Sequence, residues 1–167
     1  MDSQQLVYTL GSIAMNREID IHRSHEAAQR IKAEPRACWR NAILAQQHLP
    51  ETLYIEGWAV SPDGLVIEHG WLEQDNKVID PTLISRIEEK EEFPAYFSGV
   101  RYTAEETIET LNETEGHLPL VCRDGYWGRE TTPYMIAYCD AWEYAGDLHA
   151  VELSESFREH IADTRDL

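Results

Sequence analysis

A helix-like segment bounded by two prolines and followed by three strand-like runs is the feature that most constrains this fold. Pro35 precedes the segment ACWRNAILAQQHL, and Pro50 follows it. A proline loses no hydrogen bond in the first turn of a helix, so the spacing predicts a helix that begins near 35–37. Three runs rich in β-branched and aromatic residues come next, at 53–60, 65–73 and 77–82. The sequence therefore predicts a helix packed beside an antiparallel meander.

The short polar turn QDN decides which residues of the last two runs face each other. If residues 74 and 75 form the centre of this turn, His69 lies directly opposite Asp80. Opposed residues of an antiparallel pair share a face of the sheet, and their side chains are close enough to interact. A slip of one residue would put them on opposite faces. This register predicts a histidine–carboxylate pair.

A second carboxylate competes for the same histidine. The turn SPDG has proline at its second position and glycine at its fourth, which is typical of a type I turn, and counting across it brings Glu56 opposite His69. The alternative role of Glu56 is that of a solvated or capping carboxylate near the sheet surface. Asp80 is preferred because Pro81 ends the strand there, and active groups are often displayed where strands end.

Cys38 is the candidate nucleophile because it stands at the predicted helix start. The unpaired amides and the dipole of a helix N-terminus favour a thiolate, and the same amides can donate to an oxyanion. By itself, a cysteine at this position is better explained as a buried structural thiol. A histidine oriented by a carboxylate is the second half of a thiol triad, so we predict that Cys38, His69 and Asp80 converge.

The order of four segments, ACWRNA, YIEGWA, IEHGWLE and VIDPT, resembles a family pattern. It is similar to the bacterial papain-like and transglutaminase-like cysteine enzymes, in which a helix-borne cysteine is followed by strands that bear histidine and then aspartate. The resemblance covers about residues 36–82 and extends more loosely through YFSGVRYT. It implies a papain-like α+β fold, with N-terminal helices and the nucleophile at a helix start packed on an antiparallel sheet.

The resemblance also implies a chemistry. In such enzymes a thiolate attacks the carbonyl of an amide, ester or thioester, so Cys38 would be the nucleophile, His69 the general base and acid, and Asp80 the orienting carboxylate. The implied activity is hydrolysis of an amide or isopeptide bond in a peptide, protein or small amide substrate. Peptidase, amidase, deamidase and transglutaminase-like acyltransferase stay open, because they differ in cleft shape and acyl acceptor rather than in the triad.

Four further residues are weaker candidates for the oxyanion hole or the substrate cleft. Gln29 and Asn41 carry side-chain amides near the nucleophile, although Gln29 is also typical of a surface residue and Asn41 of a helix residue bonded to nearby backbone. Trp39 and Trp71 either pack the helix against the sheet or line the cleft.

A pair of histidines, His22 and His25, shares one face of a predicted helix. Two histidines without a cysteine or carboxylate in ligand geometry make a weak metal site. We therefore expect no metal and no cofactor.

The remaining segments carry local signals. An amphipathic stretch from Ile19 to Lys32 predicts a helix, and Thr103 followed by Glu106 forms a capping-box pattern that predicts another over 103–112. Elsewhere we expect a solvent-facing charged segment at 87–93, a strand at 96–103 and a short strand at 118–122. The loop at 125–133 is either a substrate-contacting flap or an exposed turn. Residues 134–145 form a helix or a strand, and 154–167 an exposed helix or a frayed terminus.

Length and hydrophobic content predict one domain. With 167 residues, 43% of them hydrophobic, the chain can bury one sizeable core. Within a single papain-like domain spanning 1–167, we expect a catalytic core at 36–102, an N-terminal helical segment at 1–34 and a C-terminal helix and loop extension at 103–167.

The net charge of −17, from 31 acidic and 14 basic residues, repels phosphate backbones and anionic lipid. It argues against nucleic-acid binding, and no apolar run is long enough to span a membrane. Three widely spaced cysteines and the absence of an export signal predict a reduced, cytoplasmic location. The alternative function is a catalytically silent acidic interaction protein, in effect a nucleic-acid mimic, that binds a basic protein surface.

Overall fold

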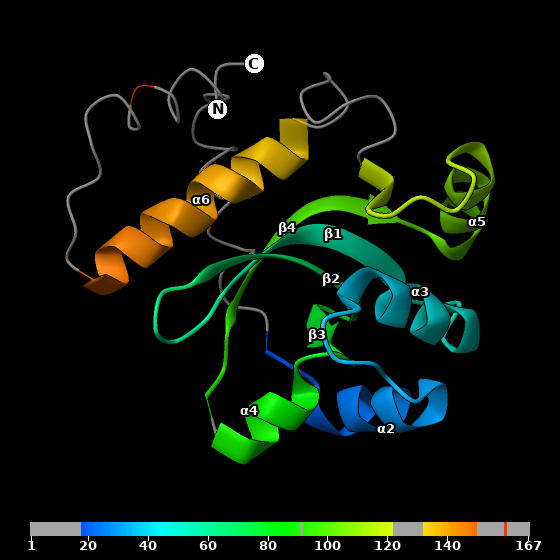
Figure 1. The fold of residues 1–167 in the computed structure, drawn as a ribbon, viewed down its shortest axis with the longest axis horizontal. Helices are drawn as coiled ribbons and strands as arrows, with labels where there is room; N and C mark the ends of the chain where they lie inside the picture. The colour runs from blue at the N-terminus through cyan, green and yellow to red at the C-terminus, as the bar shows by residue number, and fades with distance from the viewer. Residues whose placement is uncertain (1–17, 91, 122–131, 150–158, 160–167) are drawn as a thin grey trace.

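Four antiparallel strands in the order β3-β2-β1-β4 form the centre of the computed structural model, which describes residues 18–90, 92–121, 132–149 and 159 (Figure 1). The strands are β1 (Leu53–Val60), β2 (Val66–Gln74), β3 (Lys77–Ile79) and β4 (Ala95–Tyr102). The helices of the described part are α2 (Ile21–Ile31), α3 (Cys38–His48), α4 (Ile84–Lys90), α5 (Ala104–Glu113) and α6 (Thr132–His149). The protein is therefore α+β, as the sequence predicts.

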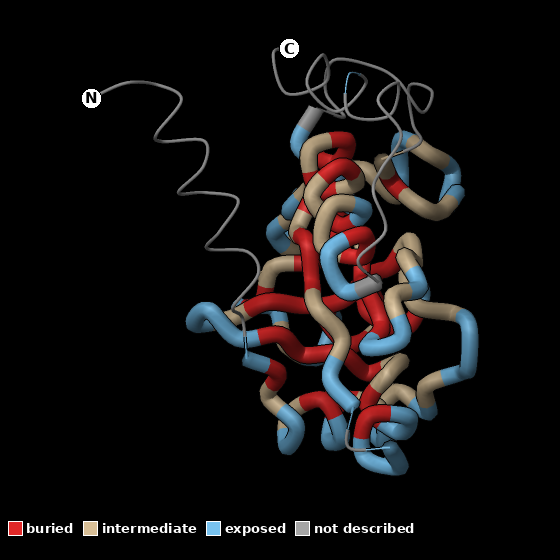
Figure 2. Tube along the Cα trace, turned by 90° about the vertical axis from the view of Figure 1, so that its left-hand side faces the viewer, coloured by how far each residue is buried: buried red, intermediate tan, exposed pale blue. Residues whose placement is uncertain are grey.

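Helices cover both faces of this sheet (Figure 1), and buried residues lie along the strands and on the helix faces that pack on them (Figure 2). On one face, α3 buries Ala42 and Ala45 against Tyr54 and Leu72. The helix α6 packs beside it on β1 and β4 through three alanines at helical spacing, Ala137, Ala141 and Ala145.

On the opposite face, Ile87 of α4 packs with Ile55 and Trp71. The helix α2 lies beside α3 and the edge strand β3, as Figure 1 shows at the lower right. The alternation of side chains along β1 and β2 thus separates two apolar clusters, one under α3 and one under α4.

The helices α2 and α5 each begin with a side-chain cap. The Asp20 carboxylate accepts the amide of Arg23 at the start of α2, at 3.0 Å. Thr103 and Glu106 form the predicted capping box at the start of α5. By contrast α3, whose preceding residue is Ala37, has no side-chain cap, so its first amides keep their capacity to donate.

The hairpin between β2 and β3 has a two-residue loop, Asp75 and Asn76, in which both residues have positive φ angles, 51° and 63°. Gln74 consequently pairs with Lys77. The predicted turn centre at residues 74 and 75 is one position too early, which shifts every partner by two residues. A shift of two preserves the face of each side chain. His69 and Asp80 are not directly opposed, yet they still share a face.

The pairing between β1 and β2 differs from the prediction by a single residue. Gly57, not Glu56, lies opposite His69, and Glu56 pairs with Gly70. A slip of one residue moves a side chain to the other face of the sheet. The predicted position of Glu56 opposite His69 is therefore wrong.

Several element predictions need correction. The strand predicted at 77–82 ends at Ile79 because the chain turns at Pro81, and the charged segment at 87–93 belongs in part to the helix α4. Residues 118–121 form a bend and a short turn instead of a strand, and 134–145 is helical within α6. Cys122 and the loop 125–131 lie outside the described residues, as does 154–167 apart from residue 159.

None of the helices in the described ranges has the length and apolar character that crossing a membrane requires.

Gly70→Ala is expected to lower the free energy of unfolding by about 1–3 kcal/mol, measured by urea denaturation. A Cβ at this position would lie 2.8 Å from Cδ1 of Trp39 and 3.2 Å from its Cα. The second contact is with the backbone at the start of α3, which cannot rotate away as a side chain does. The helix start must therefore shift, and we expect Cys38 to react more slowly with iodoacetamide.

Gly116→Ala is the matched control for this substitution. Gly116 has open space around it but a φ of +79°, so alanine there costs backbone strain and leaves α3 in place. Equal rates of Cys38 alkylation in the two variants would contradict the view that Gly70 seats the start of α3.

Candidate active site

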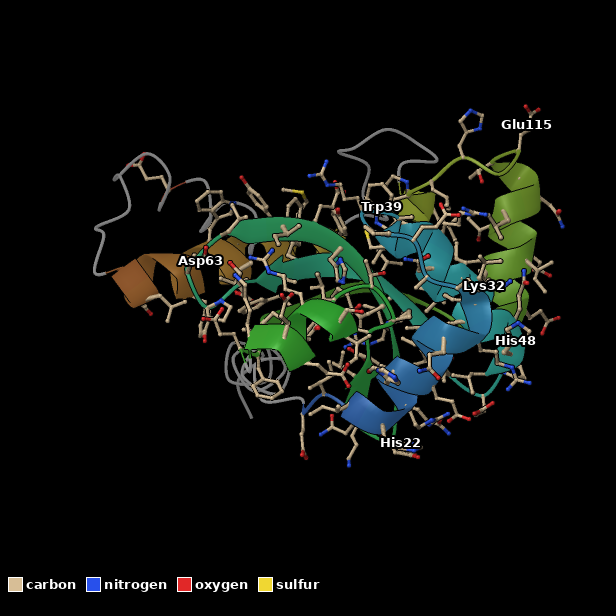
Figure 3. The ribbon with its side chains drawn as sticks, turned by 60° about the horizontal axis from the view of Figure 1, so that its bottom comes forward. His22, Lys32, Trp39, His48, Asp63 and Glu115 are labelled. Atoms are coloured by element: carbon tan, nitrogen blue, oxygen red, sulfur yellow. The ribbon has the colours of Figure 1, made fainter. Side chains whose placement is uncertain are left out.

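Cys38 is the first residue of α3 and is partly exposed to solvent. Trp39 follows it, and its ring and backbone press on Gly70 of β2 (Figure 3 marks Trp39 at the start of α3). Gly70 is adjacent in sequence to His69. A glycine at this position lets the helix start approach the strand closely, which brings the thiol to the histidine.

His69 lies between the thiol and a carboxylate. Its side chain is 3% exposed, and its Nε2 atom is 2.8 Å from Oδ2 of Asp80. The Cys38 side chain also raises the pKa of His69, so the thiol lies beside the ring. Because Nε2 is directed at Asp80, Nδ1 is the nitrogen left for the thiol. The structure thus brings the three predicted triad residues together in one chain of contacts.

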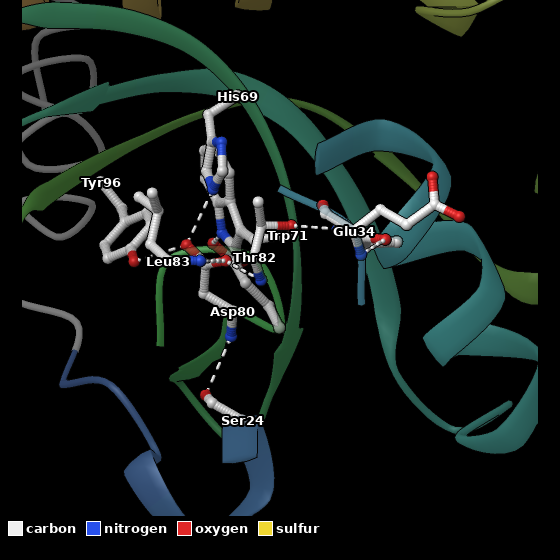
Figure 4. A network of polar contacts seen from close by, with 10 residues as sticks. Ser24, Glu34, His69, Trp71, Asp80, Thr82, Leu83 and Tyr96 are labelled. Atoms are coloured by element: carbon white, nitrogen blue, oxygen red, sulfur yellow. Dashed lines mark hydrogen bonds and ion pairs between the residues drawn. The ribbon is translucent and has the colours of Figure 1, made fainter. Parts of the chain in front are cut away.

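Asp80 is fully buried and accepts four hydrogen bonds (Figure 4). Oδ1 accepts the backbone amides of Thr82 and Leu83 at 2.8 and 2.9 Å. Oδ2 accepts from His69 and from the hydroxyl of Tyr96, each at 2.8 Å. The Oδ1 pattern is that of a helix cap, here on the turn that leads into α4. One carboxylate therefore holds both a turn and the imidazole.

The backbone of Asp80 is fixed from the opposite side. Its amide donates to the hydroxyl of Ser24 at 2.9 Å, and that hydroxyl in turn donates to the carbonyl of Asp20 at 2.6 Å. Ser24 is itself fully buried in α2. The N-terminal helix thus positions the carboxylate, a contribution that the sequence signals did not predict.

The charges of this pair stabilise each other. Burial by itself lowers the pKa of His69, but the negative charge of Asp80, its hydrogen bond and a smaller contribution from Cys38 raise it to about 10. Burial by itself raises the pKa of Asp80, but the charge of His69 and the hydrogen bonds from His69, Leu83 and Tyr96 hold it below its ordinary value. At neutral pH the site therefore contains an imidazolium and a carboxylate.

Aromatic rings enclose the imidazole on the side away from solvent. Trp71 stacks on His69 with ring centroids 6.0 Å apart, and Tyr96 packs on Trp71 at 5.2 Å. Trp71 is fully buried. The suggestion that Trp71 lines an open substrate cleft is therefore wrong, and it forms a wall behind His69.

Asn41 and Gln29 do not face the thiol as oxyanion donors. The side chain of Asn41 is buried: it accepts the amide of Glu34 and donates to the carbonyl of Glu34 and to the hydroxyl of Thr82. Gln29 is exposed on α2, where it contacts His25 at 2.7 Å. Asn41 thus ties the loop before Cys38 to the turn that holds Asp80.

Glu56 is fully buried on the other face and holds a different segment. Its carboxylate accepts the hydroxyl of Tyr54 at 2.7 Å and the amides of Leu120 and Val121 at 2.7 and 2.8 Å. Burial raises its pKa, although these hydrogen bonds counteract the shift. Glu56 is therefore neither a solvated carboxylate nor the partner of His69.

The two N-terminal histidines lie on the surface of α2, where Figure 3 shows His22 pointing outward. His25 is paired with Glu88 at 3.0 Å. Within the described ranges, no cluster of three histidine, cysteine or carboxylate side chains has metal-binding geometry. Two small surface cavities, one beside α4 and one between α2 and α3, are not lined by triad residues.

Comparison of this chain with protein-family models, with curated proteins and with solved structures gave no match.

The free energy of unfolding is expected to fall between about pH 6.5 and 10. The pKa of His69 rises from an ordinary 6.5 to about 10 on folding, so the folded protein binds this proton more tightly than the unfolded chain. The resulting stabilisation is complete below pH 6.5 and disappears as the pH rises through 10. Urea denaturation of wild type and His69→Asn at fixed ionic strength measures it. Parallel pH dependences in the two proteins would show that His69 contributes nothing.

Asp80→Asn is expected to slow alkylation of Cys38 at pH 7 by at least about tenfold. Asparagine can still accept the amides of the turn, but it has no charge to hold the imidazolium. Glu56→Gln is the matched control, because it also replaces a buried carboxylate by an amide but on the other face. We expect its alkylation rate to stay within about twofold of wild type. The opposite ranking of the two variants would transfer the orienting role to Glu56.

Proposed function

We propose that this protein is a cysteine-dependent acyl-transfer enzyme that hydrolyses an amide or isopeptide bond through Cys38, His69 and Asp80. One observation carries the proposal: a buried histidine contacts a partly exposed thiol and a fully buried carboxylate. A structural cysteine in a core needs no charged partner. A nucleophile needs a base, and the base needs a group that fixes its orientation.

The proposed reaction begins with the imidazolium of His69 beside the thiolate of Cys38. Sulfur attacks the substrate carbonyl carbon and forms a C–S bond, and the carbonyl oxygen becomes an oxyanion. His69 donates its proton to the leaving nitrogen as the C–N bond breaks, which leaves a thioester on Cys38. A water molecule then attacks the thioester, His69 accepts its proton, and the carboxylic acid and the thiolate are released.

The start of α3 is suited to stabilise the oxyanion. The helix has no side-chain cap, so the amides of its first turn can donate to an oxygen at the thiol. The positive end of the helix dipole acts in the same direction for the thiolate and for the oxyanion. These backbone donors replace the side-chain amides of Asn41 and Gln29 that the sequence suggested.

The proposal includes a papain-like or transglutaminase-like assignment. It is supported by the order of Cys38, His69 and Asp80 along the chain, by the helix that carries the cysteine and by the antiparallel strands that follow it. Hydrolysis is favoured over transfer to another acceptor because water needs no binding site of its own. The proposed substrates are peptides, proteins and small amides.

Acylation by p-nitrophenyl acetate tests this function. We expect a burst of p-nitrophenol of about one equivalent per protein, and an acetyl group on Cys38 in the peptide mass spectrum. Cys38→Ala should abolish both, whereas Cys139→Ala removes a fully buried thiol and should leave both unchanged.

The result that would overturn the proposal is a folded protein without acetyl-Cys38 and with equal ester turnover in wild type and Cys38→Ala. In that case the acidic interaction protein, which binds a basic partner through its net charge of −17, becomes the better hypothesis.

A further inference from the structure

Tyr96 of β4 donates its hydroxyl to the same oxygen of Asp80 that faces His69. Tyr96 is 3% exposed, and its ring packs against the rings of Trp71 and His69, with centroids 5.2 and 6.4 Å away. In Figure 4 it reaches Asp80 from the side opposite to Glu34 and α3. The Tyr96 hydroxyl and the His69 imidazole therefore bind the same carboxylate oxygen.

We propose that Tyr96 is a positioning residue of the thiol site, which holds the Asp80 carboxylate in the orientation that directs Nδ1 of His69 at Cys38. The inference rests on the proposed function. It adds to the Cys-His-Asp triad a fourth member that touches neither the substrate nor the reacting atoms.

The hydrogen bonds of Asp80 show what the hydroxyl contributes. The amides of Thr82 and Leu83 bind Oδ1 and fix one end of the carboxylate. Rotation about the Cβ–Cγ bond moves Oδ1 and Oδ2 together, so a donor on Oδ2 restricts this rotation further. Tyr96 is the donor that holds Oδ2 independently of His69, since the phenol is fixed by its own packing. Removing it leaves His69 and Asp80 to orient each other.

Small residues of β1 leave space for Tyr96 of β4 to extend to Asp80. Tyr96 pairs with Ala59, and the next residue of β1 on the same face is Gly57, which lies opposite His69. Ala59 and Gly57, the two smallest residues of β1, thus lie between β4 and the strand that carries His69. A Cβ on Gly57 would lie 2.3 Å from the carbonyl oxygen of Phe97 and 2.9 Å from the ring of Trp71. The structure therefore has no room for a larger residue at position 57.

Among the described residues, two titratable groups form hydrogen bonds with Asp80. His69 faces it from β2 and Tyr96 from β4, and α3 adds Cys38 behind His69. The residue that α2 contributes, Ser24, does not titrate in this range. Loss of the Tyr96 donor removes one of the groups that stabilise the charged carboxylate, so Asp80 should take up a proton at higher pH.

Tyr96→Phe keeps the ring and removes only the donor. We expect Cys38 alkylation at pH 7 to slow about three- to tenfold, and the acidic limb of its pH profile to move to higher pH. The proton resonance between Nε2 of His69 and Asp80 should shift in the downfield NMR spectrum. Tyr102→Phe is the matched control: its ring stacks on Tyr54, 5.8 Å away and outside the triad, so it should change neither readout.

The outcomes separate this inference from the proposed function. If wild-type Cys38 reacts no faster than the thiol of a denatured chain, the proposed function fails, and a shifted downfield resonance in Tyr96→Phe would still support the contact with Asp80. If wild-type Cys38 is reactive while Tyr96→Phe has the wild-type pH profile and an unshifted resonance, Tyr96 is merely a packing residue and only the inference is overturned.

Discussion

The buried carboxylate of Asp80 is the group on which the rest of the site depends. A charge with no exposure to water is costly unless it is paired and hydrogen-bonded, and here four donors meet it from three directions: the turn before α4, β2 and β4. The hydrogen bonds to this carboxylate fix where the meander ends, where α4 begins and how the imidazole is oriented. The helix α2 completes the arrangement by binding the backbone of Asp80 through Ser24. Structural and chemical requirements thus coincide in a single side chain.

The sequence predicted this pair although the counted register was wrong. A two-residue loop at Asp75 and Asn76 moved the partners by two positions, and the period of a strand is two, so His69 and Asp80 stayed on one face. The same method failed for Glu56, where an error of one residue reversed the face. Counting across a turn therefore predicts which face a side chain occupies only when the loop length is known to be odd or even. The capping box at Thr103 was predicted correctly because both of its partners lie within one helical turn.

What the sequence could not predict are contacts between segments far apart along the chain. Tyr96 is one of eight tyrosines, and no local pattern distinguishes it. Its contact with Asp80 depends on the strand order, which places β4 next to β1 rather than next to β3. Glu56 is a similar case: its partners, the amides of Leu120 and Val121, come from a segment more than sixty residues away. The sequence predicts the bonding of Asn41 to nearby backbone, which the structure confirms. Its hydrogen bond to Thr82 could not be predicted without the fold.

The three side chains of the site differ in exposure to solvent, and this difference supports the proposed catalytic role. A thiol that served only packing would be buried with its neighbours, as Cys139 is. Here the thiol is partly exposed, whereas the imidazole is 3% exposed and the carboxylate fully buried. Desolvation strengthens the interaction between the two charges and keeps water from competing for Nε2. Of the three side chains, the thiol is the most exposed, and the imidazole and the carboxylate lie behind it against Trp71 and Tyr96. Burying a charged pair is expensive, and the bonds from Asp80 to the turn before α4 use Oδ1 and do not involve the imidazolium. The expense is understandable if the imidazolium serves the thiol.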